Sequence, residues 1–111
     1  MKIWVDDIRP APEGWCQAYS VNAAKEMILA NYPNIEGISL DHDSSIYNQF
    51  GGDYINILKW LEEEEYTIRK LGEKIVTFPI HIHSMNPVGA QNMRNIIQHN
   101  NWKEVPFWDL I

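Results

Sequence analysis

The sequence contains one cysteine, Cys16, in 111 residues. A single cysteine excludes a disulfide within the chain, and it excludes the zinc sites that are built from several cysteines. No apolar run approaches the roughly 20 residues that a helix needs to cross a bilayer. The chain turns acidic at Asp6 after three apolar residues, which is not the pattern of a signal peptide. These absences predict a cytoplasmic protein without a membrane helix.

Positive charge is also scarce. Nine Lys and Arg residues stand against fifteen Asp and Glu residues, so the net charge is −6 when the histidines are neutral. Duplex DNA and anionic membranes attract proteins through broad basic surfaces, so we expect neither as a partner. A phosphate group would have to be held locally, by a few side chains.

The rest of the composition, 45% hydrophobic and 22% charged, is typical of a globular protein. No repeat or low-complexity tract divides the chain, so we predict one domain over residues 1–111. Short apolar runs predict strands at residues 3–5, 17–19, 35–40 and 79–84, with a final edge strand at 102–107.

Segments with helical spacing of apolar residues lie between these strands. We predict that their N-caps are Ser20 or Asn22, then Asp53, then Asn86, which is followed by Pro87 at the first helical position. Strands that alternate with helices indicate an α/β fold with a mainly parallel sheet of four to five strands.

Acidic and polar residues follow three of the predicted strands directly. They are Asp6-Asp7, Asp41-His42-Asp43 and His83-Ser84. The carboxyl ends of parallel strands meet at one edge of a sheet, and ligands bind in the crevice outside that edge. We therefore expect these residues to converge in one site.

Carboxylates that meet in one crevice repel each other unless a hard cation or a shared proton compensates their charge. Asp6, Asp7 and Asp41 are the residues that we expect to hold Mg²⁺ or Mn²⁺, because both ions prefer oxygen ligands. The alternative is that these aspartates only cap loops and helices.

The histidines are candidates for proton transfer near neutral pH. His81 and His83 lie two residues apart on a predicted strand, so their side chains share a face. His81 also has a simpler interpretation as a core histidine. His42 stands between two aspartates and is a candidate ligand, a candidate base, or a solvent-facing residue.

A phosphate group would be held at the start of the last predicted helix. Ser84 and Asn86 lie at that N-terminus, whose free N–H groups favour an anion, although helix capping explains both residues equally well. Arg9 is the candidate guanidinium for the phosphate oxygens. The alternative partner for Arg9 is a surface ion pair with Glu13.

The positions of Asp6-Asp7, Asp41 and Ser84 resemble those of the receiver domain of response regulators. This resemblance implies a three-layer, flavodoxin-like sandwich with helices on both faces. It also implies that the acidic pair holds Mg²⁺ and that Asp41 and Ser84 contact a phosphoryl group. The chain departs from the receiver pattern at Val105, which stands where a lysine belongs, and at the loop 9–14, which is too short for the first receiver helix.

The motifs WVDDIRPAP at 4–12, SLDHD at 39–43 and IHSMNPVG at 82–89 more closely resemble the cyclic-phosphate processing receiver-like family. The resemblance spans nearly the whole chain. It implies action on cyclic phosphates, such as RNA 2′,3′-cyclic ends or cyclic nucleotides, in bacterial and phage RNA repair or conflict.

Our first hypothesis is a phosphoesterase that opens a cyclic phosphodiester. In it, Asp6, Asp7 and Asp41 hold the cation and Arg9, Ser84 and Asn86 hold the phosphate. His83, together with His81 or His42, moves protons. The alternative is a non-catalytic module that binds a nucleotide, a phosphate or a protein. A weaker alternative is an atypical phosphorelay receiver with Asp41 as the phosphoryl acceptor.

Overall fold

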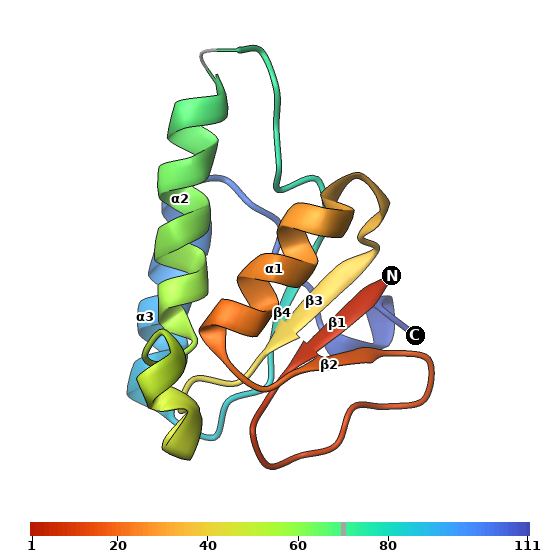
Figure 1. Cartoon of the computed structure of the whole chain (residues 1–111), viewed down its shortest axis with the longest axis vertical. Helices are drawn as coiled ribbons and strands as arrows, with labels where there is room; N and C mark the ends of the chain where they lie inside the picture. Colours follow the sequence, from red (N-terminus) through yellow and green to blue (C-terminus); the bar gives the residue numbers. More distant parts are fainter. Residues whose placement is uncertain (70) are drawn as a thin grey trace.

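Four short parallel strands form the sheet in the computed structural model, which describes residues 1–69 and 71–111. The strands are β1 (Lys2–Val5), β2 (Cys16–Ala18), β3 (Gly37–Leu40) and β4 (Ile80–Ile82). Their order in the sheet is β2-β1-β3-β4, and each pair of neighbours is parallel (Figure 1). All four strands therefore present their carboxyl ends at the same edge.

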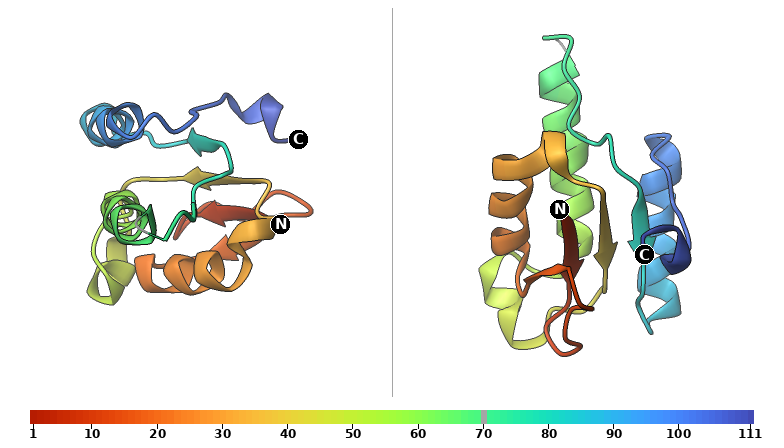
Figure 2. Two further views of the ribbon diagram at one scale, coloured as in Figure 1. Left: turned by 90° about the horizontal axis from the view of Figure 1, so that it is seen from above. Right: turned by 90° about the vertical axis from the view of Figure 1, so that its right-hand side faces the viewer.

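Three α-helices connect or follow the strands: α1 (Val21–Asn31), α2 (Ile55–Arg69) and α3 (Pro87–His99). The helices lie side by side on one face of the sheet (Figure 2). Their buried side chains form one hydrophobic core with the strand residues that face the helices, which are Ile3, Val5, Ile38, Leu40, Ile80 and Ile82. We call this side of the sheet the helical face.

The opposite side, the second face, carries the alternate residues of the same strands. Trp4, Ser39 and His81 are register partners across β1, β3 and β4. The aromatic rings of Trp15 and Phe107 cover them, because both rings contact Trp4 and Phe107 also contacts His81. The α/β class with a parallel sheet is therefore confirmed, but α-helices on both faces are not: the second face is covered by a loop and by one turn of 3₁₀ helix, Phe107–Asp109.

The predicted edge strand at 102–107 is wrong over most of its length. The structure has one parallel bridge there, between Ile80 and Glu104, and the Val105 N–H donates to the Ile80 carbonyl. Pro106 follows and has no N–H to continue the ladder, so the chain turns into the 3₁₀ helix instead.

Two of the three predicted N-caps are confirmed. Ser20 accepts a hydrogen bond from the Ala23 N–H, and Asn86 accepts one from the Gly89 N–H. Asp53 does not cap α2, because the 3₁₀ helix before it, Ser45–Phe50, brings other donors to its carboxylate. The Asp53 carboxylate accepts hydrogen bonds from the backbone of Ser44 and the side chain of Asn48.

Within the described residues, no helix combines the length and the apolar composition that crossing a bilayer requires.

We expect Ser20→Ala to lower the free energy of unfolding by about 1 kcal/mol, because the first turn of α1 loses its side-chain cap. Urea denaturation followed by circular dichroism measures the change. Ser20→Asp supplies another capping carboxylate and serves as the matched control. An equal loss in both variants would show that packing of the buried hydroxyl, rather than capping, stabilises this end of α1.

Candidate functional site

The carboxylate of Asp6, directly after β1, is fully buried and accepts four hydrogen bonds. Its Oδ1 atom accepts from the backbone N–H groups of Ile8 at 2.8 Å and Arg9 at 3.0 Å. Its Oδ2 atom accepts from Arg9 Nη1 at 3.1 Å and from His83 Nε2 at 2.9 Å. Burial by itself raises the pKa of Asp6, but the two backbone donors and His83 outweigh it and lower the pKa below its usual value. Asp6 is therefore a buried anion.

The loop after Asp6 is held by two side chains of the strands. Trp4 Nε1 donates to the Arg9 carbonyl at 3.0 Å. The Gln17 amide donates to the carbonyls of Asp6 and Arg9, and its Oε1 atom accepts from the Ala11 N–H. These bonds orient the backbone N–H groups that bind the Asp6 carboxylate. The short loop thereby has a defined structure without the helix that a receiver domain has at this point.

A cleft of about 310 Å³ lies at the carboxyl edge of the sheet. It gathers residues from the loops after β1, β3 and β4, and its lining consists of Asp7, Ile8, Arg9, Asp41, Asp43, Ser45, Met85 and Asn86. Four of these residues, Asp7, Asp41, Asp43 and Asn86, belong to the motifs that the sequence places at strand ends or at the helix N-terminus. Of the nine predicted site residues, the cleft lining contains four, which are Asp7, Arg9, Asp41 and Asn86.

Arg9 provides the positive charge among the residues that line this cleft. Its Nη1 atom lies 3.1 Å from Asp6 Oδ2 and 3.6 Å from Asp41 Oδ2, so it pairs with the site aspartates rather than with Glu13. The side chain is 43% exposed and borders the cleft. A guanidinium in this position faces an incoming anion.

Asp41 lies at the exit of β3 and is mostly buried. Its Oδ1 atom accepts from the His42 N–H at 2.8 Å. Burial and the negative charge of Asp6 raise the pKa of Asp41, against the opposing effects of the His42 N–H and Arg9. Asp41 therefore binds a proton more readily than an exposed aspartate does.

Carboxylate oxygens of Asp6, Asp7 and Asp41 lie within 4.8 Å of one another. Asp7 Oδ1 is buried, and it has no hydrogen-bond partner among the described residues. A buried carboxylate oxygen without a donor is unfavourable, and a hard divalent cation is a suitable partner for it. The three residues that the sequence proposes as ligands thus fit Mg²⁺ or Mn²⁺.

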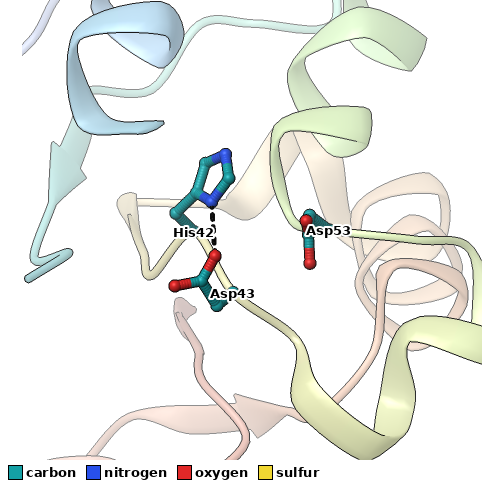
Figure 3. Close-up of side chains that lie close together, drawn as sticks. All are labelled: His42, Asp43 and Asp53. Carbon is teal, nitrogen blue, oxygen red and sulfur yellow. Dashed lines mark hydrogen bonds and ion pairs between the residues drawn. The ribbon is translucent and has the colours of Figure 1, made fainter. Parts of the chain in front are cut away.

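A second group of possible ligands contains His42, Asp43 and Asp53 (Figure 3). His42 Nδ1 and Asp43 Oδ1 form a hydrogen bond of 2.8 Å, while Asp53 Oδ1 is already engaged by Ser44 and Asn48. Asp6 in the first group is hydrogen-bonded as well, so the difference lies in Asp7 Oδ1, a buried oxygen without a partner, which the second group lacks among the described residues. Figure 3 shows His42 hydrogen-bonded to Asp43. Asp43 is also one of the residues that line the cleft.

The ring of His42 packs against the first turn of α3. A Cβ atom on Gly89 would lie 2.5 Å from this ring, so the glycine of the NPVG motif is required by close approach. The side chain of His42 is only 14% exposed, which excludes the solvent-facing interpretation. Packing against α3 and the bond to Asp43 hold the ring in place.

His81 and His83 point to the second face, as their spacing predicts. The Nδ1 atom of each lies 2.7 Å from Ser39 Oγ, and the His83 ring stacks on Trp4 with centroids 3.8 Å apart. Burial lowers the pKa of His83 to about 4, although Asp6 opposes this effect, and burial also lowers the pKa of His81. Neither ring lines the cleft, and His83 reaches the site through Asp6. Their role in proton transfer stays a prediction.

Ser84 and Asn86 stabilise the turn into α3. Ser84 Oγ accepts from the Asn86 N–H at 3.0 Å, and Asn86 caps the helix. Asn86 also lines the cleft, whereas Ser84 does not. The capping interpretation therefore holds for Asn86, which also meets the cleft, while Ser84 stabilises the turn that precedes the cap.

The model of the family described as Cyclic-phosphate processing Receiver domain matches residues 1–99 of the chain. The chain belongs to this family. No curated protein and no solved structure gives a significant match. Membership agrees with the four-stranded parallel sheet and its helices, and it associates this receiver-type domain with the processing of cyclic phosphates.

This receiver domain lacks the lysine of the response-regulator pattern. Val105, at that position, is 5% exposed, and its N–H pairs with the Ile80 carbonyl beside β4. A buried valine contributes no charge to the cleft. The positive charge at the Asp6 and Asp41 carboxylates comes instead from Arg9, on a different loop.

Trp4, Gln17 and Ser39 belong to this receiver domain's site, although none of them is among the predicted site residues; Trp4 and Ser39 lie in the quoted motifs, and Gln17 lies outside them. All three face the second side of the sheet and bind the loop or the histidines. The sequence does contain a signal for Ser39, because residues 38–40 alternate between apolar and polar side chains, which places Ser39 on the opposite face from Ile38 and Leu40. The same rule that pairs His81 with His83 assigns Ser39 to their face only when the strand register is known.

In metal-free buffer, we expect the stability of the domain to fall as the pH decreases from 6.5 toward 4. The unfolded chain binds a proton at His83 near pH 6.5, whereas the folded protein accepts it only near pH 4, so the loss reaches about 3 kcal/mol. Asp6, whose folded pKa is lowered, adds a further loss below its ordinary value of 3.8.

Urea titrations across this pH range measure the slope. His83→Gln keeps an N–H donor for Asp6 but does not titrate, so its slope should be flatter, and His99→Gln at an exposed site is the matched control. Equal slopes for wild type and His83→Gln would contradict the assignment of a neutral, buried His83.

Proposed function

We propose that this receiver domain is a phosphoesterase that hydrolyses a cyclic phosphodiester, either an RNA 2′,3′-cyclic end or a cyclic nucleotide. The observation that carries the proposal is the cleft in which Asp7, Asp41 and Arg9 meet Asn86 at the start of α3. Carboxylates for a cation and donors for a phosphate lie together there. The family description supplies the substrate class.

Asp6, Asp7 and Asp41 would hold Mg²⁺ or Mn²⁺. When bound, the cation would polarise the phosphoryl group and neutralise the acidic cleft. Without such a cation, the carboxylates of Asp7, Asp41 and Asp43 would repel an anionic substrate, since one guanidinium lies among the residues lining the cleft. The buried, unpartnered Asp7 Oδ1 supports this assignment.

Arg9 and Asn86 are positioned to bind non-bridging phosphate oxygens. The guanidinium donates in plane and is always charged, so it suits a phosphoryl group whose negative charge grows during attack. The amide of Asn86 and the N-terminus of α3 face the same cleft. Ser84 contributes by holding the Asn86 backbone in place.

The hydrolysis forms a bond from a water oxygen to phosphorus and breaks one of the two ring P–O bonds. Asp43 borders the cleft, and its Oδ1 atom accepts from His42 Nδ1, so this pair can take the water proton and return it to the leaving oxygen. His83 acts from behind the site, where its N–H keeps the Asp6 carboxylate anionic.

The purified protein with Mg²⁺ or Mn²⁺ should convert at least one 2′,3′- or 3′,5′-cyclic nucleotide to its monophosphate, which phosphorus NMR detects. Asp43→Asn should lower kcat about a hundredfold, because the proton acceptor is lost. Asp109→Asn, the same change at an exposed site away from the cleft, is the matched control. No turnover across the panel, with or without cation, would overturn the proposed function.

Mn²⁺ should bind the protein, as measured by water proton relaxation, and Asp7→Asn should abolish or strongly weaken this binding. The reason is that an amide cannot supply the anionic oxygen now found unpartnered at Asp7 Oδ1. Asp53→Asn tests the alternative group with His42 and should leave the affinity unchanged. If Asp53→Asn weakened Mn²⁺ binding and Asp7→Asn did not, the cation site would be the group of His42, Asp43 and Asp53 instead.

Two further experiments distinguish the two other functions. A ligand that raises the melting temperature without turnover would indicate a binding module. Transfer of phosphoryl from a small phosphodonor to Asp41 would indicate a phosphorelay receiver. The burial of uncharged Val105 at the position of the receiver lysine argues against this second outcome.

A further inference from the structure

The hydroxyl group of Ser39 lies between two imidazole rings on the second face. Ser39 Oγ is 2.7 Å from His81 Nδ1 and 2.7 Å from His83 Nδ1, and the serine is fully buried. A hydroxyl has one hydrogen, so it can donate to one of these nitrogens and must accept from the other. The two histidines therefore differ in protonation at Nδ1, whichever way the hydroxyl points.

Asp6 decides the direction. An anionic carboxylate only accepts hydrogen bonds, so His83 Nε2, which lies 2.9 Å from Asp6 Oδ2, carries a hydrogen. In neutral His83 the Nδ1 atom is then a lone-pair acceptor. Ser39 donates to His83 and accepts from Nδ1–H of His81, which leaves His81 Nε2 without a hydrogen.

We propose that Ser39 is a positioning residue: it passes the tautomer that Asp6 imposes on His83 to His81 as the opposite tautomer, and its hydrogen bond to Nδ1 helps to aim the His83 N–H at Asp6. Trp4 fixes the plane of the His83 ring, because the two rings stack at 5°. Ser39 fixes the rotation of that ring within the plane. The chain His81–Ser39–His83–Asp6 thereby connects the second face to the carboxylate behind the cleft.

The consequence for the site rests on the proposed cation site. A group that hydrogen-bonds a ligand residue from outside the coordination sphere orients that residue, and its removal typically weakens metal binding by about 10 to 100-fold. Removing the Ser39 hydroxyl leaves buried ring nitrogens of both histidines without partners. The His83 ring then keeps its bond to Asp6 and its stacking on Trp4 but loses the contact that fixes its rotation, so Asp6 is held less precisely.

The first test is nitrogen-15 NMR of the imidazole rings in the metal-free protein. Wild type should show His83 with its hydrogen on Nε2 and His81 with its hydrogen on Nδ1. In Ser39→Ala, His83 should keep Nε2–H because Asp6 still requires a donor, and His81 should change to Nε2–H, the tautomer that free histidine favours in water. The same tautomer for both rings in wild type, or an unchanged His81 in the variant, would overturn the proposal.

The second test is Mn²⁺ affinity, which should fall about 10 to 100-fold in Ser39→Ala. Ser20→Ala also loses a buried hydroxyl but lies at the start of α1, so it controls for lost stability and should keep the wild-type affinity. Equal affinities in the two variants would show that Ser39 does not position Asp6. If wild type did not bind Mn²⁺, the proposed cation site would be rejected. The nitrogen-15 NMR test, which needs no metal, would then decide by itself whether Ser39 links the two histidines as proposed.

Discussion

A buried carboxylate is stable as an anion only where donors surround it, and Asp6 has four of them from two parts of the chain, the loop after β1 and His83 after β4. The loop contributes the backbone of Ile8 and Arg9, the guanidinium arrives from Arg9, and β4 leads into His83. Each donor group must itself be held in position by neighbouring side chains. The stacking of Trp4 on His83 and the hold of Gln17 on the loop are arrangements that keep these donors aimed at one group.

The sheet separates stability from chemistry by its two faces. Ile3, Ile38 and Ile80 pack under the helices, where burial of apolar surface supplies the main stabilising free energy. The alternate positions form a polar and aromatic second face, on which Ser39 links two histidines. An α-helix on that face would bring an apolar stripe against these polar groups. A loop and one 3₁₀ turn cover them with Trp15 and Phe107 instead.

Part of the negative charge that makes up the net charge of −6 lies at one cleft. The carboxylates of Asp7, Asp41 and Asp43 border one cleft, and Asp6 lies buried beside it. Arg9 offsets some of this charge by contacting both Asp6 and Asp41. The cleft therefore combines an excess of negative charge with a buried carboxylate oxygen that has no partner among the described residues, which is the electrostatic basis for the divalent cation that we propose.

The α/β class, the strand ends at which the polar residues lie, and the caps at Ser20 and Asn86 can be predicted from the sequence, because they depend on short-range periodicity and on the chemistry of single residues. The failure at Asp53 came from donors five and nine residues earlier in the chain, and the failure at 102–107 came from the N–H that Pro106 lacks. The contact of His83 with Asp6 rather than with the cleft, and the bonds of Ser39 to two histidines 42 and 44 residues away, are visible only in the folded structure. Such contacts depend on strand order and register, which the periodicity of one strand does not contain.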